Sequence, residues 1–325
     1  MSAGVPFNLE DVPARLVSAA IPTPTGFALR SVDAVHHVGP SGDVTTLATF
    51  PDPSPFGVHG LARVGPSLFT FDRPLVGPPT LVEVHADGTR TRHEGACGHH
   101  PAGLTTVGPH LVLLDEPLPE TVLSIWRDGV LEPFAVARNL SHWRALGEGG
   151  LLWSDDAGIH EWRGDAPRQL VAGDGIGPFT QDLTYVRRSF TEGVARMSVV
   201  HAGAELDLSP AADPVALHRL ATGTLVQSGR VLGRAGEERV RWTLPGDGEV
   251  GPLQVAGGLL VHLQGPRTLA WSADGAAWQV MDLPVRCTRL VPAGDDALVA
   301  SSRKGSVLLT FSPGGTECPP VSAAQ

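Results

Sequence analysis

A glycine-marked hairpin turn recurs along the whole chain and limits what the sequence can fold into. The stretch LVEVHADGTRTRH, residues 81–93, places an Asp-Gly pair between two runs of alternating residues. This pattern is the strongest short-range signal for a tight β-hairpin. Comparable turns carry glycines at Gly42, Gly88, Gly129, Gly164, Gly203, Gly236, Gly275 and Gly315. Their mean spacing of 39 residues over seven intervals is typical of a repeat architecture.

Each repeat divides into four short strands. In the second repeat we expect them at GLARVG, SLFTFD, TLVEVHA and TRTRHE. Apolar residues alternate with a period of two, so the pattern favours strands over helices. A lone four-stranded sheet leaves two faces and two edges uncovered, whereas sheets arranged around an axis bury their faces and keep only short edges. The sequence therefore predicts an all-β fold, a single β-propeller of four-stranded antiparallel blades.

The repeat boundaries predict the number of blades. We expect eight blades, beginning near Arg15, Val58, Ala102, His142, Thr180, Val215, Pro252 and Cys287. Seven blades are the alternative, because the expected first strand of the fifth repeat, GPFTQD, is a poor strand sequence. No linker interrupts the repeats, so residues 1–325 are expected to form one domain, with residues 1–12 as an N-terminal extension.

One turn carries a family resemblance. SADGAAW, from Ser272 to Trp278, resembles the Asp-box repeat of sialidase-like propellers, Ser-x-Asp-x-Gly-x-x-Trp, with one residue fewer between Asp274 and Gly275. The resemblance implies a folding element in which Asp274 caps the turn and Trp278 packs between strands. It implies no catalytic residue. The chain as a whole is similar to the broad group of WD40, Asp-box and lactonase propellers, although the Gly-His and Trp-Asp signature of WD40 repeats is absent.

Composition and charge exclude several classes of protein. The formal net charge is −10, Lys304 is the only lysine, and no run of basic residues exists, so we expect no nucleic-acid partner. No segment reaches the ~18 apolar residues of a membrane helix, and the first residues lack the pattern of a signal peptide. We expect no membrane contact and a cytoplasmic location, in a bacterial type of cell. Cys97, Cys287 and Cys318 are expected to be reduced thiols.

Polar residues are expected around the central channel. Loops that enter a blade and loops that join its second and third strands should share one face. The entry loops are expected to place His59, His100, His142, Asp182 and Arg286 there. Imidazoles and a carboxylate suit zinc or another transition metal. The histidines are not at equivalent positions of their repeats, however, so we expect neither a metal nor another cofactor.

Three other groups of chemically active side chains have structural interpretations. HEGACGHH, residues 93–100, is dense in zinc-ligand types but lacks a second ligand pair, so we interpret it as a strand followed by a loop. The pairs Asp155-Asp156 and Asp295-Asp296 are interpreted as turn formers. The seven tryptophans lie mostly in expected strands and are interpreted as packing between blades rather than as a carbohydrate-stacking groove.

Two apolar, proline-rich loops point to a function. DRPLVGPPT, residues 72–80, contains Leu75 and Val76, and DEPLPET, residues 115–121, contains Leu118. Both should lie on the channel face and form a raised apolar lip. No set of acid, base and nucleophile is evident. We therefore expect a non-catalytic propeller that acts as a protein-binding scaffold subunit and contacts another protein subunit through its channel-face loops.

Two alternative functions stay open. The first is a metal-assisted lactonase or lyase that acts on a small molecule with His59, His100, His142 and Asp182 around the channel. The second is a carbohydrate-binding propeller of the Asp-box type. Elemental analysis of the purified protein distinguishes the first alternative from a binding subunit, and a glycan array distinguishes the second.

Overall fold

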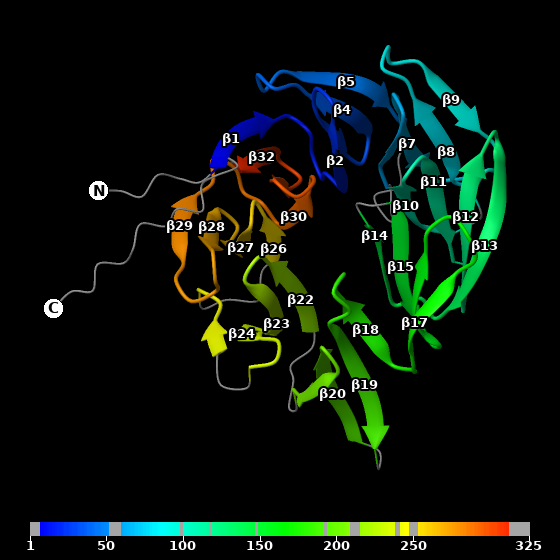
Figure 1. Ribbon diagram of the computed structural model, residues 1–325. Coiled ribbons are helices and arrows are strands. Elements are labelled where there is room, and N and C mark those ends of the chain that lie inside the picture. The colour runs from blue at the N-terminus through cyan, green and yellow to red at the C-terminus, as the bar shows by residue number, and fades with distance from the viewer. Residues whose placement is uncertain are drawn as a thin grey trace.

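Eight four-stranded antiparallel sheets form a ring in the computed structural model of the chain (Figure 1). The structure describes residues 7–51, 60–97, 100–116, 119–146, 149–191, 194–208, 215–237, 241–246 and 253–311. The predicted eight-bladed propeller is confirmed, and the alternative of seven blades is wrong. Within the described residues, no helix is long and apolar enough to cross a membrane.

The first four blades follow one another along the chain. Blade 1 contains β2 (Ala19–Thr23), β3 (Gly26–Arg30), β4 (Ala34–Val38) and β5 (Val44–Thr49). Blade 2 contains β6 (Ala62–Val64), β7 (Ser67–Asp72), β8 (Thr80–Val84) and β9 (Arg90–His93). Blade 3 contains β10 (Pro101–Val107), β11 (His110–Asp115), β12 (Glu120–Arg127) and β13 (Val130–Arg138). Blade 4 contains β14 (His142–Leu146), β15 (Gly150–Asp155), β16 (Gly158–Trp162) and β17 (Arg168–Ala172).

The last four blades complete the ring. Blade 5 contains β18 (Ile176–Phe179), β19 (Tyr185–Thr191), β20 (Val194–His201) and β21 (Ala204–Asp207). Blade 6 contains β22 (Val215–Leu220), β23 (Gly223–Ser228), β24 (Val231–Arg234) and β25 (Arg241–Thr243). Blade 7 contains β26 (Leu253–Ala256), β27 (Leu259–Gly265), β28 (Thr268–Ser272) and β29 (Gln279–Asp282). Blade 8 contains β30 (Arg289–Pro292), β31 (Ala297–Ser301), β32 (Ser306–Phe311) and β1 (Phe7–Val12).

The ring closes through its N-terminal strand. β1 pairs antiparallel with β32, with Phe7 opposite Phe311, and so forms the outer strand of blade 8. Residues 7–12 of the expected extension are therefore part of a blade. The turn at Gly315 and the residues after it lie outside the described residues, so β1 is the outer strand of blade 8 in the part that the structure describes. Closing the last blade with a distant strand removes an exposed edge and joins the two ends of the repeat series.

The recurring turn glycines have the backbone conformation that explains them. The seven that lie in described residues all have φ between +79° and +102°, a region that side chains disfavour. In the β12–β13 hairpin, Asp128 and Gly129 have φ of 50° and 87°, which is the pattern of a type I′ turn and matches the twist of the paired strands.

Strand direction divides the connections between two faces of the ring. Turns between first and second strands, and between third and fourth strands, lie on one face, which we call the turn face. Loops between second and third strands, and those that enter the next blade, lie on the opposite face, which we call the loop face. The first strands of the blades surround the axis in Figure 1. The central channel along this axis therefore opens on both faces.

Apolar side chains between neighbouring blades form the core. Every residue of β15 and of β31 is buried, because each of these strands has another blade on both sides. Between blades 3 and 4, Trp153 and Trp162 are nearly inaccessible, and Phe134 stacks on Trp162 with ring centroids 4.4 Å apart. This packing confirms the interpretation of those two tryptophans as contacts between blades.

A buried arginine joins blade 1 to blade 2. The side chain of Arg30 in β3 is 0% exposed, and its guanidinium lies 4.1 Å from the centroid of the Phe50 ring. It donates to Thr70 Oγ1 at 3.0 Å and to the Phe71 carbonyl at 3.2 Å, both in β7. Burial lowers the pKa of Arg30 to about 10, with the charges of Asp72 and Asp33 acting in the opposite direction. The blade 1–blade 2 seam is thus held by hydrogen bonds as well as by apolar contact.

Candidate functional site

The β7–β8 loop on the loop face exposes two adjacent apolar side chains. Leu75 is 67% exposed and Val76 is 88% exposed. Gly77 follows them with φ of 118°, which allows the chain to turn back toward blade 2. The loop therefore presents apolar surface to solvent, as expected for the part of the apolar lip formed by residues 72–80. Leu118, the other half, lies outside the described residues.

The two ends of this loop are fixed in blade 2. Asp72 and Thr80, the strand residues at its base, are buried and opposite each other in the sheet. Arg92 Nη1 donates to Asp72 Oδ2 at 2.8 Å, and Cys97 Sγ donates to the Pro79 carbonyl at 3.0 Å. The exposed pair is therefore carried on an anchored base, so it loses little conformational freedom when a partner binds.

A third exposed apolar residue lies on the same face. Phe190 in β19 is 80% exposed, close to the end of the strand where β19 turns into β20. In Figure 1 this hairpin projects beyond the rest of the ring. Sequence reasoning missed Phe190 because it lies within a strand, where an aromatic residue is usually interpreted as core. The polar neighbours in RRSFTEG were the available signal.

The predicted polar residues of the loop face are only partly brought together. His59 lies outside the described residues. His100 is exposed, and its backbone N–H donates to Asp115 Oδ1 at 3.1 Å. His142 is the first residue of β14, and Arg286 is exposed in the loop between β29 and β30. These three residues come from blades 3 and 4 and from the entry to blade 8, on the face where the sequence placed them.

Chemistry at the described histidines is limited. Desolvation, followed by the charge of Arg188, lowers the pKa of His142, so its imidazole is neutral at pH 7. Across the described ranges, no group of three or more His, Cys, Asp or Glu side chains is close enough to hold a metal ion. A lowered pKa makes the imidazole of His142 a weaker base than an ordinary histidine.

Asp182 lies on the opposite face from the one expected. The first strand of blade 5 is β18 (Ile176–Phe179), so Asp182 lies in the turn between the first and second strands, on the turn face. The expected blade start near Thr180 is wrong, because β18 ends at Phe179; Gly177 and Pro178 make it a poor strand sequence, and its pairing with β19 is irregular. Of the residues of the lactonase hypothesis, His100 and His142 therefore lie on the loop face and Asp182 lies on the turn face, and His59 is outside the described residues.

Asp182 belongs instead to a charged group at the turn-face end of the channel. Arg219 Nη1 lies 2.8 Å from Asp182 Oδ2. Burial alone would raise the pKa of Asp182, but the hydrogen bond from Thr180 and the charge of Arg219 leave it below its ordinary value. Partial enclosure lowers the pKa of Arg144, against the effect of the Asp295 and Asp182 carboxylates. The Asp182–Arg219 ion pair thus links blade 5 to blade 6. Because the pKa of Asp182 is lowered, its carboxyl group is ionised at pH 7 and cannot act as a general acid.

The remaining reactive groups of the described chain are also structural. Cys97 and Cys287 are unpaired thiols whose pKa burial raises to about 11, so both are protonated at pH 7. Cys318 lies outside the described residues. Asp155 Oδ1 accepts the Ala157 N–H at 2.9 Å and lies 2.9 Å from His160 Nε2, as expected of a turn former. All seven tryptophans are described, and none is exposed.

Comparison with known proteins places the chain among propellers. No protein-family model matches the sequence, and no curated protein matches it. Among solved structures, Sqt1 of Saccharomyces cerevisiae has a TM-score of 0.60 at 10% identity, over 96% of this chain and 99% of that chain. BamB of Moraxella catarrhalis has a TM-score of 0.59 at 13% identity, over 94% and 100%. YCF48 bound to a D1 peptide has a TM-score of 0.55 at 10% identity, over 95% and 96%. At these identities the similarity shows the fold, a β-propeller, and no narrower family.

Proposed function

We propose that the protein is a non-catalytic binding subunit whose loop face contacts another protein through Leu75 and Val76. The observation that carries this proposal is the adjacent, strongly exposed apolar pair on a loop with an anchored base. Exposing adjacent apolar side chains to water costs free energy. Such exposed apolar patches often mark interaction sites on a protein surface. Functional contacts on a rigid scaffold are most often made by such loops.

The proposed partner presents an apolar patch to the β7–β8 loop. Leu75 and Val76 would act as the central contacts, because anchors of an interface are apolar or aromatic side chains that become fully desolvated. Phe190 on the same face offers a second contact point. The solved complex of YCF48 with a peptide shows that a similar fold can hold a polypeptide, and this supports a protein partner.

The two alternative functions receive no comparable support. His100 and His142 lie on the loop face, whereas Asp182 lies on the turn face and is already paired with Arg219. The buried or half-buried tryptophans provide no open stacking surface for a sugar. Both alternatives therefore serve as outcomes of the test below.

Co-purification with a double variant tests the proposal. Tagged wild-type protein and the variant Leu75→Ser/Val76→Ser would be isolated gently from the native host, followed by gel filtration and identification of the co-eluting protein. We expect a stoichiometric partner with the wild type and a loss of about tenfold or more with the variant, because truncating central contacts of an interface costs most of the binding energy.

The matched control is Val136→Ser, which removes a 59% exposed valine from the outer strand β13. This control should keep the partner, and both variants should melt at the wild-type temperature. The proposal is wrong if the double variant keeps the partner or if no partner co-elutes. It is replaced by the lactonase or lyase hypothesis if the protein carries a stoichiometric metal that His100→Ala and His142→Ala remove. A specific hit on a glycan array would replace it by carbohydrate binding.

A further inference from the structure

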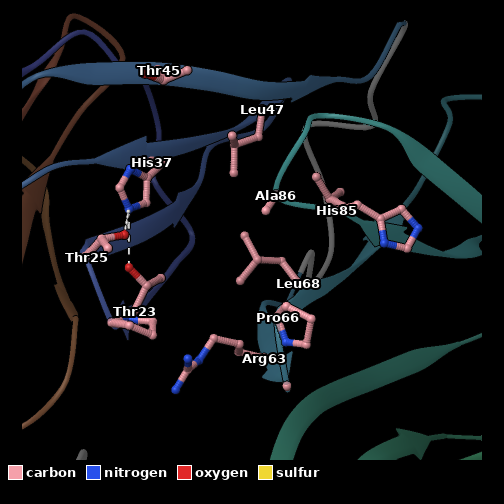
Figure 2. Close-up of a pocket in the computed structure, with 13 residues that line it drawn as sticks. Thr23, Thr25, His37, Thr45, Leu47, Arg63, Pro66, Leu68, His85 and Ala86 are labelled. Atoms are coloured by element: carbon pink, nitrogen blue, oxygen red, sulfur yellow. Dashed lines mark hydrogen bonds between the residues drawn. The ribbon is translucent and has the colours of Figure 1, made fainter.

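A pocket opens on the turn face between blade 1 and blade 2. Its volume is about 450 Å³, within the range of small-molecule sites. It lies under the β2–β3, β6–β7 and β8–β9 turns, and Figure 2 shows its side chains converging from the two blades. The blade 1 side contributes Thr23, Pro24, Thr25, His37, Thr45 and Leu47. The blade 2 side contributes Arg63, Gly65, Pro66, Leu68, Val84, His85 and Ala86.

The core of the seam between blades 1 and 2 borders the pocket, because Leu47, Leu68 and Val84 belong to both. This core also contains the small side chains Ala28 and Ala48 and the larger Phe50 and Leu61. Arg30 holds the two blades together within the same seam. The pocket is therefore bordered by a seam that is held by apolar contacts and hydrogen bonds.

The polar side chains of the pocket differ in their availability. His37 Nε2 lies 3.1 Å from Thr25 Oγ1 and 3.3 Å from Thr23 Oγ1, and Figure 2 draws both hydrogen bonds. The ring nitrogens of His85 are occupied by Ser67 at 3.4 Å and Thr91 at 3.2 Å, and its ring turns away from the pocket in Figure 2. These histidines are therefore satisfied within their own blades.

Arg63 is different, because its guanidinium has no ion-pair or hydrogen-bond partner among the described residues. Its backbone is fixed: the Arg63 N–H donates to Thr106 Oγ1 at 3.1 Å, and the Thr106 hydroxyl donates to the Arg63 carbonyl at 2.8 Å. The lining contains no Asp or Glu, although the chain as a whole has a net charge of −10. The pocket therefore combines mostly apolar walls with one available cation.

We propose that this pocket binds a small molecule with an apolar body and a single carboxylate. Carboxylates pair with a guanidinium through two parallel hydrogen bonds, which suits the unpartnered Arg63. The apolar body would lie against Leu47, Leu68 and Val84, and it would remove the remaining surface of the half-buried Leu47 from water. At ~30 Å³ per water molecule, the volume corresponds to about 15 water-sized groups, enough for a medium-chain carboxylate. The site lies on the face opposite Leu75 and Val76 and is independent of the proposed protein contact.

Calorimetric titration with decanoate and with decanamide tests this inference, because the two ligands differ only in the charged group. Decanoate should bind one molecule per chain with a dissociation constant below about 1 mM, and decanamide should bind at least about tenfold more weakly. Arg63→Met should weaken decanoate about tenfold or more and leave decanamide unchanged. Ala86→Phe should remove binding of both, because Ala86 is exposed in the β8–β9 turn and the larger ring would fill the pocket.

The control for net charge is Arg127→Met, which removes a surface arginine paired with Glu132 in blade 3. It should bind decanoate as the wild type does, and thermal melting should show that every variant is folded. The inference is overturned if decanoate shows no saturable binding or if the acid and the amide bind equally well. It is overturned equally if folded Arg63→Met, or folded Ala86→Phe, binds decanoate like the wild type.

Discussion

At the scale of single residues, polar side chains define turns and seams that apolar packing alone would leave ambiguous. Arg30 supplies donors to backbone carbonyls in the seam between blades 1 and 2. In the β28–β29 turn, Asp274 Oδ1 accepts the N–H groups of Ala276 at 2.8 Å and Ala277 at 3.3 Å. Trp278 Nε1 donates to the Gly275 carbonyl at 3.0 Å in the same turn. Each contact satisfies a backbone group that would otherwise need water.

The turn at Asp274 predicts a pH-dependent stability. Burial alone would raise the pKa of Asp274, but the N–H groups of Ala276 and Ala277 and the Ser272 hydroxyl leave it below its ordinary value. Because the native pKa is depressed, this carboxylate stabilises the fold above its unfolded-state pKa of about 4, and the stabilisation is lost as the pH falls through the native pKa. Asp274→Ala should cost about 1 kcal/mol of unfolding free energy at pH 7.

Urea unfolding of wild type, Asp274→Ala and Asp274→Asn at pH 7 and at acidic pH measures this effect. The difference between wild type and Asp274→Ala should shrink below about pH 4. Asp274→Asn keeps an acceptor oxygen, so it should cost less, and its own stability should lack this titration. A difference between wild type and Asp274→Ala that is constant with pH would contradict the assigned role of the carboxylate.

Residue-level features were predictable where the local sequence decides them. Prolines and polar residues around Leu75 and Val76 predict an exposed loop, and both side chains are exposed. Asp182 was placed on the wrong face, because the Gly-Pro sequence within β18 obscures where that strand begins and ends. Nothing in the letters around Arg30 indicates that it is fully buried, since its partners Thr70 and Phe71 lie in the next blade.

At the scale of strands, the hairpin is the unit that the sequence specifies. The Asp-Gly and related turns specify which strands pair within a blade, because those contacts are local in sequence. Pairing between β1 and β32 joins residues about three hundred positions apart, and no local pattern indicates it. Val12 in β1 is 3% exposed, and Leu9 packs against the core of blades 7 and 8. The N-terminal strand is therefore an integral part of blade 8.

Deletion of residues 1–12 tests the contribution of β1. The shortened protein should lose at least about 2 kcal/mol of unfolding free energy, the value of burying one side chain such as Val12. It should also self-associate, because the edge of β32 becomes exposed. Urea unfolding and analytical ultracentrifugation measure these two effects.

Deletion of residues 1–6, which leaves β1 intact, is the control and should unfold like the full chain. A synthetic peptide of residues 7–14 should restore part of the lost stability by strand addition, and a scrambled peptide should not. Equal stability of the two deletion proteins would contradict the assignment of β1 to blade 8.

At the scale of the whole molecule, the ring separates two faces with different chemistry. The loop face carries Leu75 and Val76 on the β7–β8 loop and Phe190 near the end of strand β19. The turn face carries the pocket with Arg63 and the paired charges around Asp182. The blades between the faces are packed and hydrogen-bonded, so the two sites are held apart on one rigid body. We infer that the protein contacts a macromolecule on one face and has room for a small carboxylate on the other.

The most direct test of the central claim is a hydrogen–deuterium exchange footprint of the protein with and without its co-purified partner. Binding through the loop face should protect peptides that cover residues 72–80, with additional protection expected near Phe190. Peptides that cover the turns at residues 23–26 and 180–184 on the turn face should exchange at unchanged rates. Protection confined to the turn face, with residues 72–80 exchanging as in the free protein, would contradict the account.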